Sequence, residues 1–289
     1  MSAIFKREFK SYFVNMSGAL FISVLLLFTG IFVTAFNLIG QYAAIEYALE
    51  NVIIIFLLIV PILCMRSIAE DKRTKTDNLL YSLPIRLSSV VMGKYFAMLA
   101  VFLIPVSIMA LYPLILGQFG KGMVNFASAY SSLFGFLLLG AALIALCMFM
   151  SSLTESQVIA AVTGFAVSLL LYFITAISGM IPDTPLVSLA CFLVLAILAA
   201  LILYYLTKNI SVSLIIGAVL VILTVLLYIL NSSLFEGGFA ALLSSLALFD
   251  RFYDFTYGIF NLKDVLFYLS FSAFFVFLTV RSLDKKRWA

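Results

Sequence analysis

The stretch that decides the fold of this chain is residues 65–94, MRSIAEDKRTKTDNLLYSLPIRLSSVVMGK. It contains 6 of the chain's 17 lysine and arginine residues and lies between two apolar runs without charge. Basic residues concentrated beside long apolar runs are typical of a loop that a membrane protein keeps in the cytoplasm. Anchoring a loop needs only a few of them, so the stretch also raises a question about function.

The composition of the whole chain excludes an ordinary soluble protein. Of its 289 residues, 65% are hydrophobic and 10% are charged, and the mean hydropathy is +1.23. A soluble domain has about 25% charged residues. A globule of this size could not bury so much apolar surface, so we expect an all-α polytopic membrane protein. Residues 1–18 lack the pattern of a cleaved signal peptide, and we expect the first apolar run to be retained.

The sequence offers little for catalysis. It contains no histidine, which is the commonest general base and metal ligand. Cys64, Cys147 and Cys191 lie in apolar runs and lack C-x-x-C spacing, so we interpret them as small buried residues. The order of residues that defines a P-loop is also missing. We therefore expect no catalytic residue, no metal and no cofactor in this chain.

Runs of about 20 apolar residues, the length needed to cross a bilayer, predict about eight spans. They are 19–39, 51–67, 95–117, 128–150, 157–180, 186–206, 212–230 and 264–280. Six spans are possible if 186–230 is a re-entrant hairpin, since the turn TKNIS between its arms carries a single basic residue, Lys208.

The distribution of basic residues predicts the orientation. With the N-terminus in the cytoplasm and eight spans, 14 of the 17 lysines and arginines lie inside. The outside keeps only Lys121, Arg251 and Lys263. Such a bias predicts that both termini are cytoplasmic and that the protein is a multi-pass protein of the plasma (inner) membrane.

Two segments outside the spans have amphipathic patterns. Residues 1–18 predict an interfacial helix, because its aromatic and basic residues fall on different faces of a helix. The residues that carry this prediction are Phe5, Arg7, Phe9, Lys10 and Phe13. Residues 231–263 predict an extracytoplasmic interfacial segment of one or two short helices, with Phe249, Phe252, Tyr253, Phe255 and Tyr257 in the aromatic belt.

Acids and bases alternate at helical spacing within 66–80. Asp71 and Lys75 are four residues apart, and Glu70 and Arg73 are three apart, spacings that stabilise a solvated helix by a few tenths of a kcal/mol per pair. Leu79 and Leu80 add an apolar patch before Pro84 ends the helix. This pattern favours a short helix presented to a cytoplasmic protein partner.

The same stretch resembles the signature of ABC-2-type transporter permeases. In that family an arginine that ends the second span precedes an acidic pair, basic residues, a Gly-Thr turn, a Glu-Leu-Leu run, a proline and a lysine that opens the third span. The matching residues are Arg66, Glu70, Asp71, Lys72, Arg73, Thr76, Leu79, Leu80, Pro84 and Lys94. Lys75 stands where the family has glycine, and Asn78 where it has glutamate. These two departures put the geometry of the turn in doubt.

Other parts of the chain resemble the family more weakly. The N-terminal FKREFKSYFVNMSGALF is similar to its opening helix, and 151–161 to its turn between the fourth and fifth spans. Residues 258–288 are similar to the last span and basic tail of the gliding-motility-type branch. The pair 186–230 is extra length beyond the six-helix core of the family.

The resemblance implies a single permease domain over residues 1–289 and a function in ATP-driven transport, and it favours export over import. It implies two cytoplasmic ABC ATPase subunits, which use ATP and Mg²⁺, and a second permease that is identical or homologous. The region 66–94 would pass the movement of the ATPases to the spans, with membrane lipids as the surroundings and no nucleic acid as a partner. The coupling residues would be the nine matched residues from Arg66 to Pro84.

Two other classes of function remain open. A non-transporting membrane scaffold or sensor would need neither an ATPase nor a path for a substrate. An ion-coupled secondary transporter is less favoured, because the central parts of the predicted spans carry no ionisable residue. The substrate is not readable from the sequence.

Overall fold

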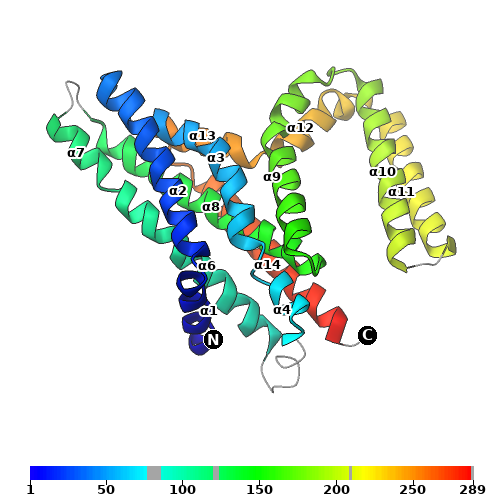
Figure 1. The fold of residues 1–289 in the computed structure, drawn as a ribbon. Helices are drawn as coiled ribbons and strands as arrows, with labels where there is room; N and C mark the ends of the chain where they lie inside the picture. Colours follow the sequence, from blue (N-terminus) through cyan, green and yellow to red (C-terminus); the bar gives the residue numbers. More distant parts are fainter. Residues whose placement is uncertain (77–85, 120–123, 208–209, 288–289) are drawn as a thin grey trace. The chain divides into compact units, whose positions relative to one another are not determined.

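The computed structural model describes residues 1–76, 86–119, 124–207 and 210–287, and these residues form helices, turns and loops without strands. Their contacts divide the chain into two compact units (Figure 1). Unit 1 comprises Met1–Leu169 and Leu248–Ala289, and unit 2 comprises Leu170–Ala247. Helix α9 (Gln157–Met180) begins in unit 1 and ends in unit 2.

Each of the eight predicted spans is helical, which confirms the all-α class. In unit 1 the helices after α1 are α2 (Ser17–Phe32) with the π-helix η1 (Val33–Ile39), α3 (Glu46–Cys64), α4 (Ala69–Arg73), α6 (Leu87–Met109), α7 (Tyr112–Phe119), α8 (Phe126–Leu153), α13 (Leu248–Thr256) and α14 (Leu262–Arg287). In unit 2 they are α10 (Pro185–Thr207), α11 (Ile210–Leu230), η2 (Ser232–Phe235) and α12 (Gly238–Ser245).

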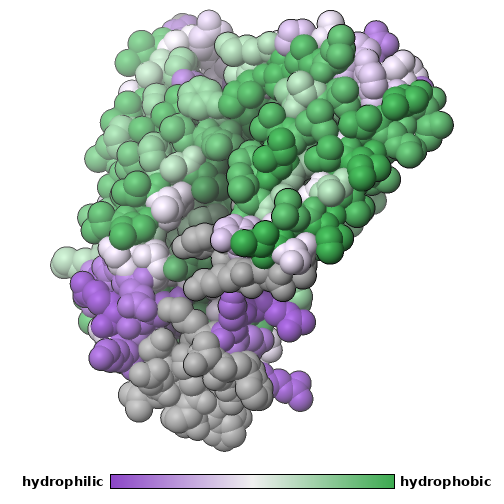
Figure 2. Space-filling model, turned by 90° about the vertical axis from the view of Figure 1, so that its right-hand side faces the viewer, coloured by the Kyte–Doolittle hydropathy of each residue, from purple (hydrophilic) through white to green (hydrophobic). Residues whose placement is uncertain are grey.

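Seven helical segments among the described residues are long and apolar enough to cross a membrane. They are Ser17–Ile39, Glu46–Arg73, Leu87–Gln118, Phe126–Leu153, Gln157–Met180, Ser213–Leu230 and Leu262–Lys285. The eighth predicted span is α10, whose apolar part in this count, Pro185–Leu201, is shorter. Hydrophobic residues cover most of the face in Figure 2, and the most hydrophilic residues gather toward its lower end.

The core of unit 1 is built around α8, which packs against α3, α6, α13 and α14. Phe56, Phe102 and Phe136 are fully buried beside one another, with ring centroids 4.7 to 5.8 Å apart. A Cβ atom at Gly140 of α8 would lie 2.2 Å from the Phe102 ring, so the glycine makes room for it. Helices surrounded by lipid gain little from the hydrophobic effect, so close packing of this kind holds them together.

The N-terminal helix is α1 (Ser2–Val14), which confirms that this segment is helical. It packs against α6 so closely that a Cβ atom at Gly93 would lie 3.0 Å from Ile4. Tyr12 is buried in unit 1, whereas Phe13 is exposed. Phe5, Phe9 and Phe13 form a row, with ring centroids 5.9 and 5.1 Å apart. The location of α1 in the membrane interface stays a prediction.

The third predicted span, 95–117, is part of a longer helical segment that is interrupted. Helix α6 starts at Leu87, and Leu87, Val90 and Val91 are buried in unit 1. It ends at Met109, and α7 starts at Tyr112. Pro113 accounts for the break, since proline lacks the amide hydrogen that would continue the helix and disfavours helical geometry in the residue before it.

The prediction that aromatic residues of 231–263 lie in the membrane interface is wrong for α13. Phe249, Phe252 and Phe255 are at most 2% exposed, because α13 lies against α8 and its apolar face joins the core of unit 1. A Cβ atom at Gly135 of α8 would lie 2.7 Å from Phe255. Tyr257, just beyond α13, is exposed. The short helices expected in this segment are present.

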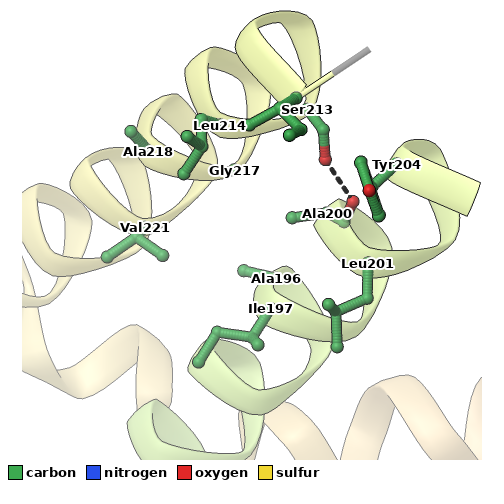
Figure 3. Close-up of a pocket in the computed structure, with 11 residues that line it drawn as sticks. Ala196, Ile197, Ala200, Leu201, Tyr204, Ser213, Leu214, Gly217, Ala218 and Val221 are labelled. Carbon is green, nitrogen blue, oxygen red and sulfur yellow. Dashed lines mark hydrogen bonds between the residues drawn. The ribbon is translucent and has the colours of Figure 1, made fainter. Parts of the chain in front are cut away.

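Unit 2 contains a hairpin of α10 and α11 that is closed by small residues. A Cβ atom at Gly217 would lie 2.7 Å from that of Ala200, and the Ser213 hydroxyl donates a hydrogen bond to the Ala200 carbonyl (Figure 3). Ala196, Leu201 and Val221 are among the residues that line a groove of about 540 Å³ between the two helices. Close approach at small residues is typical of helix pairs in membranes.

Candidate functional site

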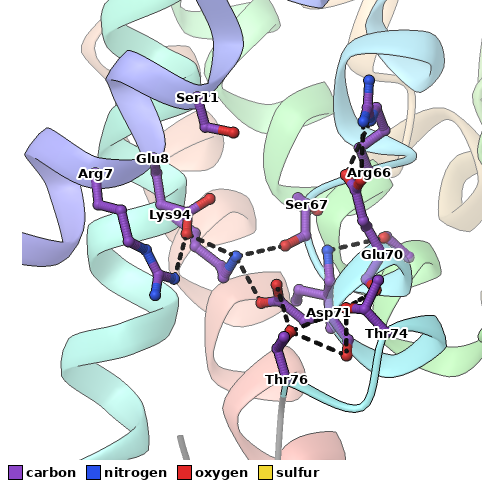
Figure 4. Close-up of polar contacts among 12 residues, drawn as sticks. Arg7, Glu8, Ser11, Arg66, Ser67, Glu70, Asp71, Thr74, Thr76 and Lys94 are labelled. Carbon is purple, nitrogen blue, oxygen red and sulfur yellow. Dashed lines mark hydrogen bonds and ion pairs between the residues drawn. The ribbon is translucent and has the colours of Figure 1, made fainter. Parts of the chain in front are cut away.

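The candidate site lies at the end of unit 1 where α4 and both chain termini are found (Figure 1). Its centre is Lys94, which is only 4% exposed. The ammonium group lies 2.8 Å from the carboxylate of Asp71 and 3.1 Å from that of Glu8, and it donates a hydrogen bond of 2.7 Å to the Ser67 carbonyl (Figure 4). An ammonium group has three donors, so these three acceptors satisfy it.

Arg7 extends this group of residues on α1. Its guanidinium lies 2.6 Å from the Glu8 carboxylate, and this hydrogen bond raises the pKa of Arg7 above its ordinary value. The Lys94 network is therefore defined here as Arg7, Glu8, Ser67, Asp71 and Lys94. It joins α1, the turn before α4, α4 itself and α6 through charges that are mostly shielded from solvent.

Helix α4 has only five residues and is held from outside by the end of α8. The Ser151 hydroxyl of α8 accepts hydrogen bonds from the backbone N–H groups of Ile68 and Ala69, at 3.3 and 3.1 Å. It thereby satisfies donors that the start of a helix leaves unpaired. Buried Lys72 donates a hydrogen bond to the Ser152 carbonyl in the last turn of α8. A cation there also complements the negative end of the helix dipole.

Arg66 and Glu70 form a separate ion pair beside the Lys94 network. Two nitrogen atoms of the Arg66 guanidinium bind the two oxygen atoms of Glu70, at 2.9 and 2.8 Å. Such a bidentate pair fixes the relative orientation of the two side chains. It ties the end of the turn after α3 to α4.

The local ion pairs expected within 66–80 are not the ones that form. Asp71 binds Lys94, which is 23 positions away in the sequence, rather than Lys75. The helix ends at Arg73, and Lys75 adopts φ 56°, so a continuous helix through residue 80 cannot form. A partner on another helix outcompetes an exposed pair on the same helix, because an exposed pair gains only a few tenths of a kcal/mol.

The structure divides the predicted coupling residues by their accessibility. Lys72 points inward to α8, whereas Arg73, Lys75 and Thr76 are exposed. The Thr76 hydroxyl donates to the Asp71 carbonyl at 3.3 Å, which places the chain after α4 beside the Lys94 network (Figure 4). Leu79, Leu80 and Pro84 lie outside the described residues, so their place in the site stays a prediction.

Several residues of the site were missed among the predicted coupling residues. Glu8 is the only acid in the first 45 residues and stands in the middle of a basic, aromatic helix. Lys94 is the only charge in the run VVMGKYFAML. Both are signals for a buried ion pair, since a lone charge among apolar residues needs a partner. Ser67, Ser151 and Ser152 carry no signal that the sequence alone could have revealed.

The geometry describes a membrane protein in which one end of a helical unit is bound together by buried ion pairs. A family model described as ABC-2 family transporter protein matches residues 3–187. This match covers more than half of the chain, so the chain belongs to the ABC-2 transporter family and is a multi-pass membrane component of an ABC transporter. No curated protein and no solved structure matches the chain.

The family match covers one continuous part of the chain, which includes most of unit 1 and the start of unit 2. The matched residues include α1 to α9, and therefore every residue of the Lys94 network and of α4. The match ends at residue 187, near the start of α10. The α10–α11 hairpin thus lies beyond the matched part, as expected for extra length in the sequence. The C-terminal α14 also lies beyond it.

Proposed function

We propose that the chain is the permease subunit of an ABC exporter and that α4 and the residues after it receive the movement of a separate ATPase. In this proposal two cytoplasmic ATPase subunits use ATP and Mg²⁺, and a second permease, identical or homologous, completes the path. The protein then lies in the plasma membrane, with both termini on the cytoplasmic side. The chain itself binds no nucleotide and hydrolyses nothing.

The observation that carries this proposal is the position of Lys94. Its contacts to Asp71 and Glu8 connect α4 and α1 with α6, while Lys72 and Ser151 connect α4 with α8. A force on the exposed side of α4 would therefore act on several helices together. ATP can drive a conformational change only if it favours one of the two conformations, and a rigid connection makes that preference available to the spans.

Charge reversal at the exposed surface tests the proposal. We expect Arg73→Glu to weaken the association of the reconstituted permease with its ATPase and to reduce substrate-stimulated ATP hydrolysis several-fold. Arg73 is exposed, so the change should leave insertion and folding intact. Lys263→Glu is the matched control, because it makes the same charge change on an exposed residue in the first turn of α14. This turn lies at the end of α14 away from the candidate site (Figure 1).

Two results bear on the proposal in opposite directions. A loss of coupling with Arg73→Glu but not with Lys263→Glu would support it. Equal transport and equal ATPase binding for Arg73→Glu, Lys263→Glu and the unmodified protein would contradict the role of α4. A permease that co-purifies with no ATPase under any condition would instead favour a scaffold or sensor.

A further inference from the structure

A cavity lined partly by polar side chains lies in unit 1 at the start of α3. It has a volume of about 290 Å³, and its walls include Tyr42, Glu46, Tyr47, Glu50, Thr256 and Tyr257. Helix α3 has 19 residues, about 28 Å of helix, and its far end leads to α4. The cavity is therefore separated from the Lys94 network by the length of a span and is a distinct site.

One wall of the cavity is a loop that is held in a defined shape. Asn37 lies in the π-helix η1 and is buried, and its amide nitrogen donates hydrogen bonds of 2.8 Å to the carbonyls of Tyr42 and Ala44. Gln41, directly before Tyr42, has φ 59°, a backbone conformation that non-glycine residues adopt rarely. Short π-helical segments occur frequently at functional sites. Here the segment positions Tyr42 at the cavity.

Two carboxylates enter the cavity from successive turns of α3. Glu46 is 8% exposed, and its carboxylate has no hydrogen bond or ion pair with any residue that the structure describes. Glu50 accepts a hydrogen bond of 2.9 Å from the Thr256 hydroxyl. Like charges four residues apart on a helix repel each other and destabilise it. A cation between the two carboxylates would remove that repulsion.

The remaining walls favour an organic cation over a metal ion. Tyr42 and Tyr47 lie with ring centroids 5.6 Å apart and tilted by 56°, and both line the cavity together with Glu46. Aromatic faces attract ammonium groups, and several rings around one cation are the usual way to bind a quaternary ammonium. Calcium instead needs six to eight oxygen ligands, and among the described residues no cluster of three metal-ligating side chains occurs.

We propose that this cavity binds the ammonium group of an organic cation, with Glu46 and Glu50 supplying the charge and the tyrosines the aromatic walls. The cavity is just below the usual size for a small-ligand pocket, about 300–1,000 Å³, and suits a head group. Two sources share this chemistry: a free organic amine and the head group of a choline or ethanolamine phospholipid. The proposal holds for the isolated chain and does not depend on transport or on an ATPase.

Binding of choline to the purified full-length protein in detergent tests the proposal by calorimetry. The comparison ligand is 3,3-dimethyl-1-butanol, which has the shape of choline without its charge. We expect choline to bind and the neutral compound not to bind. Glu46→Gln should weaken choline binding by about 30-fold or more, since removing one partner of a buried charge pair costs at least about 2 kcal/mol.

Two further variants separate a lost site from a lost fold. Tyr47→Leu keeps both carboxylates and should weaken choline binding a few-fold, as expected for one cation–π contact of about 1 kcal/mol. Glu236→Gln makes the same neutralisation at an exposed position in unit 2 and should leave binding unchanged. A thermal unfolding curve for each variant verifies that it is folded.

The outcomes divide clearly. Equal binding of the neutral compound, equal binding by folded Glu46→Gln, or competition of choline by Ca²⁺ at the same site would overturn the proposal. Nanodiscs then identify the source. If choline binds in phosphatidylglycerol nanodiscs but not in phosphatidylcholine nanodiscs, the lipid head group occupies the site. If it binds equally in both, the ligand is a free amine, and either result supports an ammonium site.

Discussion

Lys75 shows why the turn after α4 prefers a particular residue. Its φ of 56° lies in the left-handed region. There the Cβ atom crowds the carbonyl that follows it, at a cost of roughly 1–2 kcal/mol for a residue other than glycine. The ABC-2 pattern has glycine at this position, and the backbone gives the physical reason. The departure in this sequence thus keeps the geometry of the turn and accepts its strain.

Lys75→Gly is therefore expected to raise the free energy of unfolding by about 0.5–1 kcal/mol, because it removes the strain while adding some freedom to the unfolded chain. Lys10→Gly is the control, since Lys10 is an exposed residue inside α1 and glycine there should lower stability by about 0.5–1 kcal/mol. Denaturant unfolding in detergent measures both. A decrease for Lys75→Gly as large as that for Lys10→Gly would show that the turn is not strained.

Substituting Lys94 should have a stronger effect, because it leaves Asp71 without its ion-pair partner and leaves Glu8 with Arg7 alone. We expect Lys94→Met to lower the free energy of unfolding by about 3 kcal/mol, the lower end of the range for breaking a buried pair. Adding Asp71→Asn should recover part of that loss. A double-mutant cycle measures the coupling between the two residues, and simple additivity would contradict a direct contact.

At the scale of elements, the packing of α8 depends on glycines whose missing side chains leave room for aromatic rings of neighbouring helices. Gly140→Ala would place a Cβ atom 2.2 Å from the buried Phe102 ring and is expected to cost about 1–3 kcal/mol by overpacking. Gly30→Ala in α2 is the matched control, because a Cβ atom there meets nothing within 4 Å. It should be neutral or slightly stabilising. Thermal unfolding of the two variants compares them, and equal midpoints would mean that the core yields to the added methyl group.

The elements also show what sequence patterns can and cannot predict. Apolar runs predicted each long helix, because crossing a bilayer fixes the length of a helix and requires it to satisfy its own backbone. The pattern could not predict that α13 turns its phenylalanines to α8, because an aromatic face suits a membrane interface and a protein core equally well. The ion pair between Asp71 and Lys94 is likewise a tertiary contact, and local spacing in the sequence cannot predict it.

At the scale of the whole molecule, the bias of basic residues predicts on which side each loop lies. After removal of the three native cysteines, we expect Lys263→Cys to react with a membrane-impermeant maleimide on intact cells. Lys10→Cys and Lys285→Cys should react only after permeabilisation. Thr207→Cys discriminates the eight-span prediction from the six-span alternative. Reaction on intact cells would place the turn between α10 and α11 outside and favour the hairpin.

The division of unit 1 along the chain has a consequence for biosynthesis. Helices α13 and α14 complete the packing around α8, yet they are translated only after the 78 residues of unit 2. At about 5–20 residues per second, the ribosome spends roughly 4–16 s on unit 2. During that delay the surface of α8 that later packs against α13 and α14 has no protein partner from these helices. A nascent chain stalled before residue 248 would keep that surface exposed and so offer a target to the proteases that remove unfinished membrane proteins.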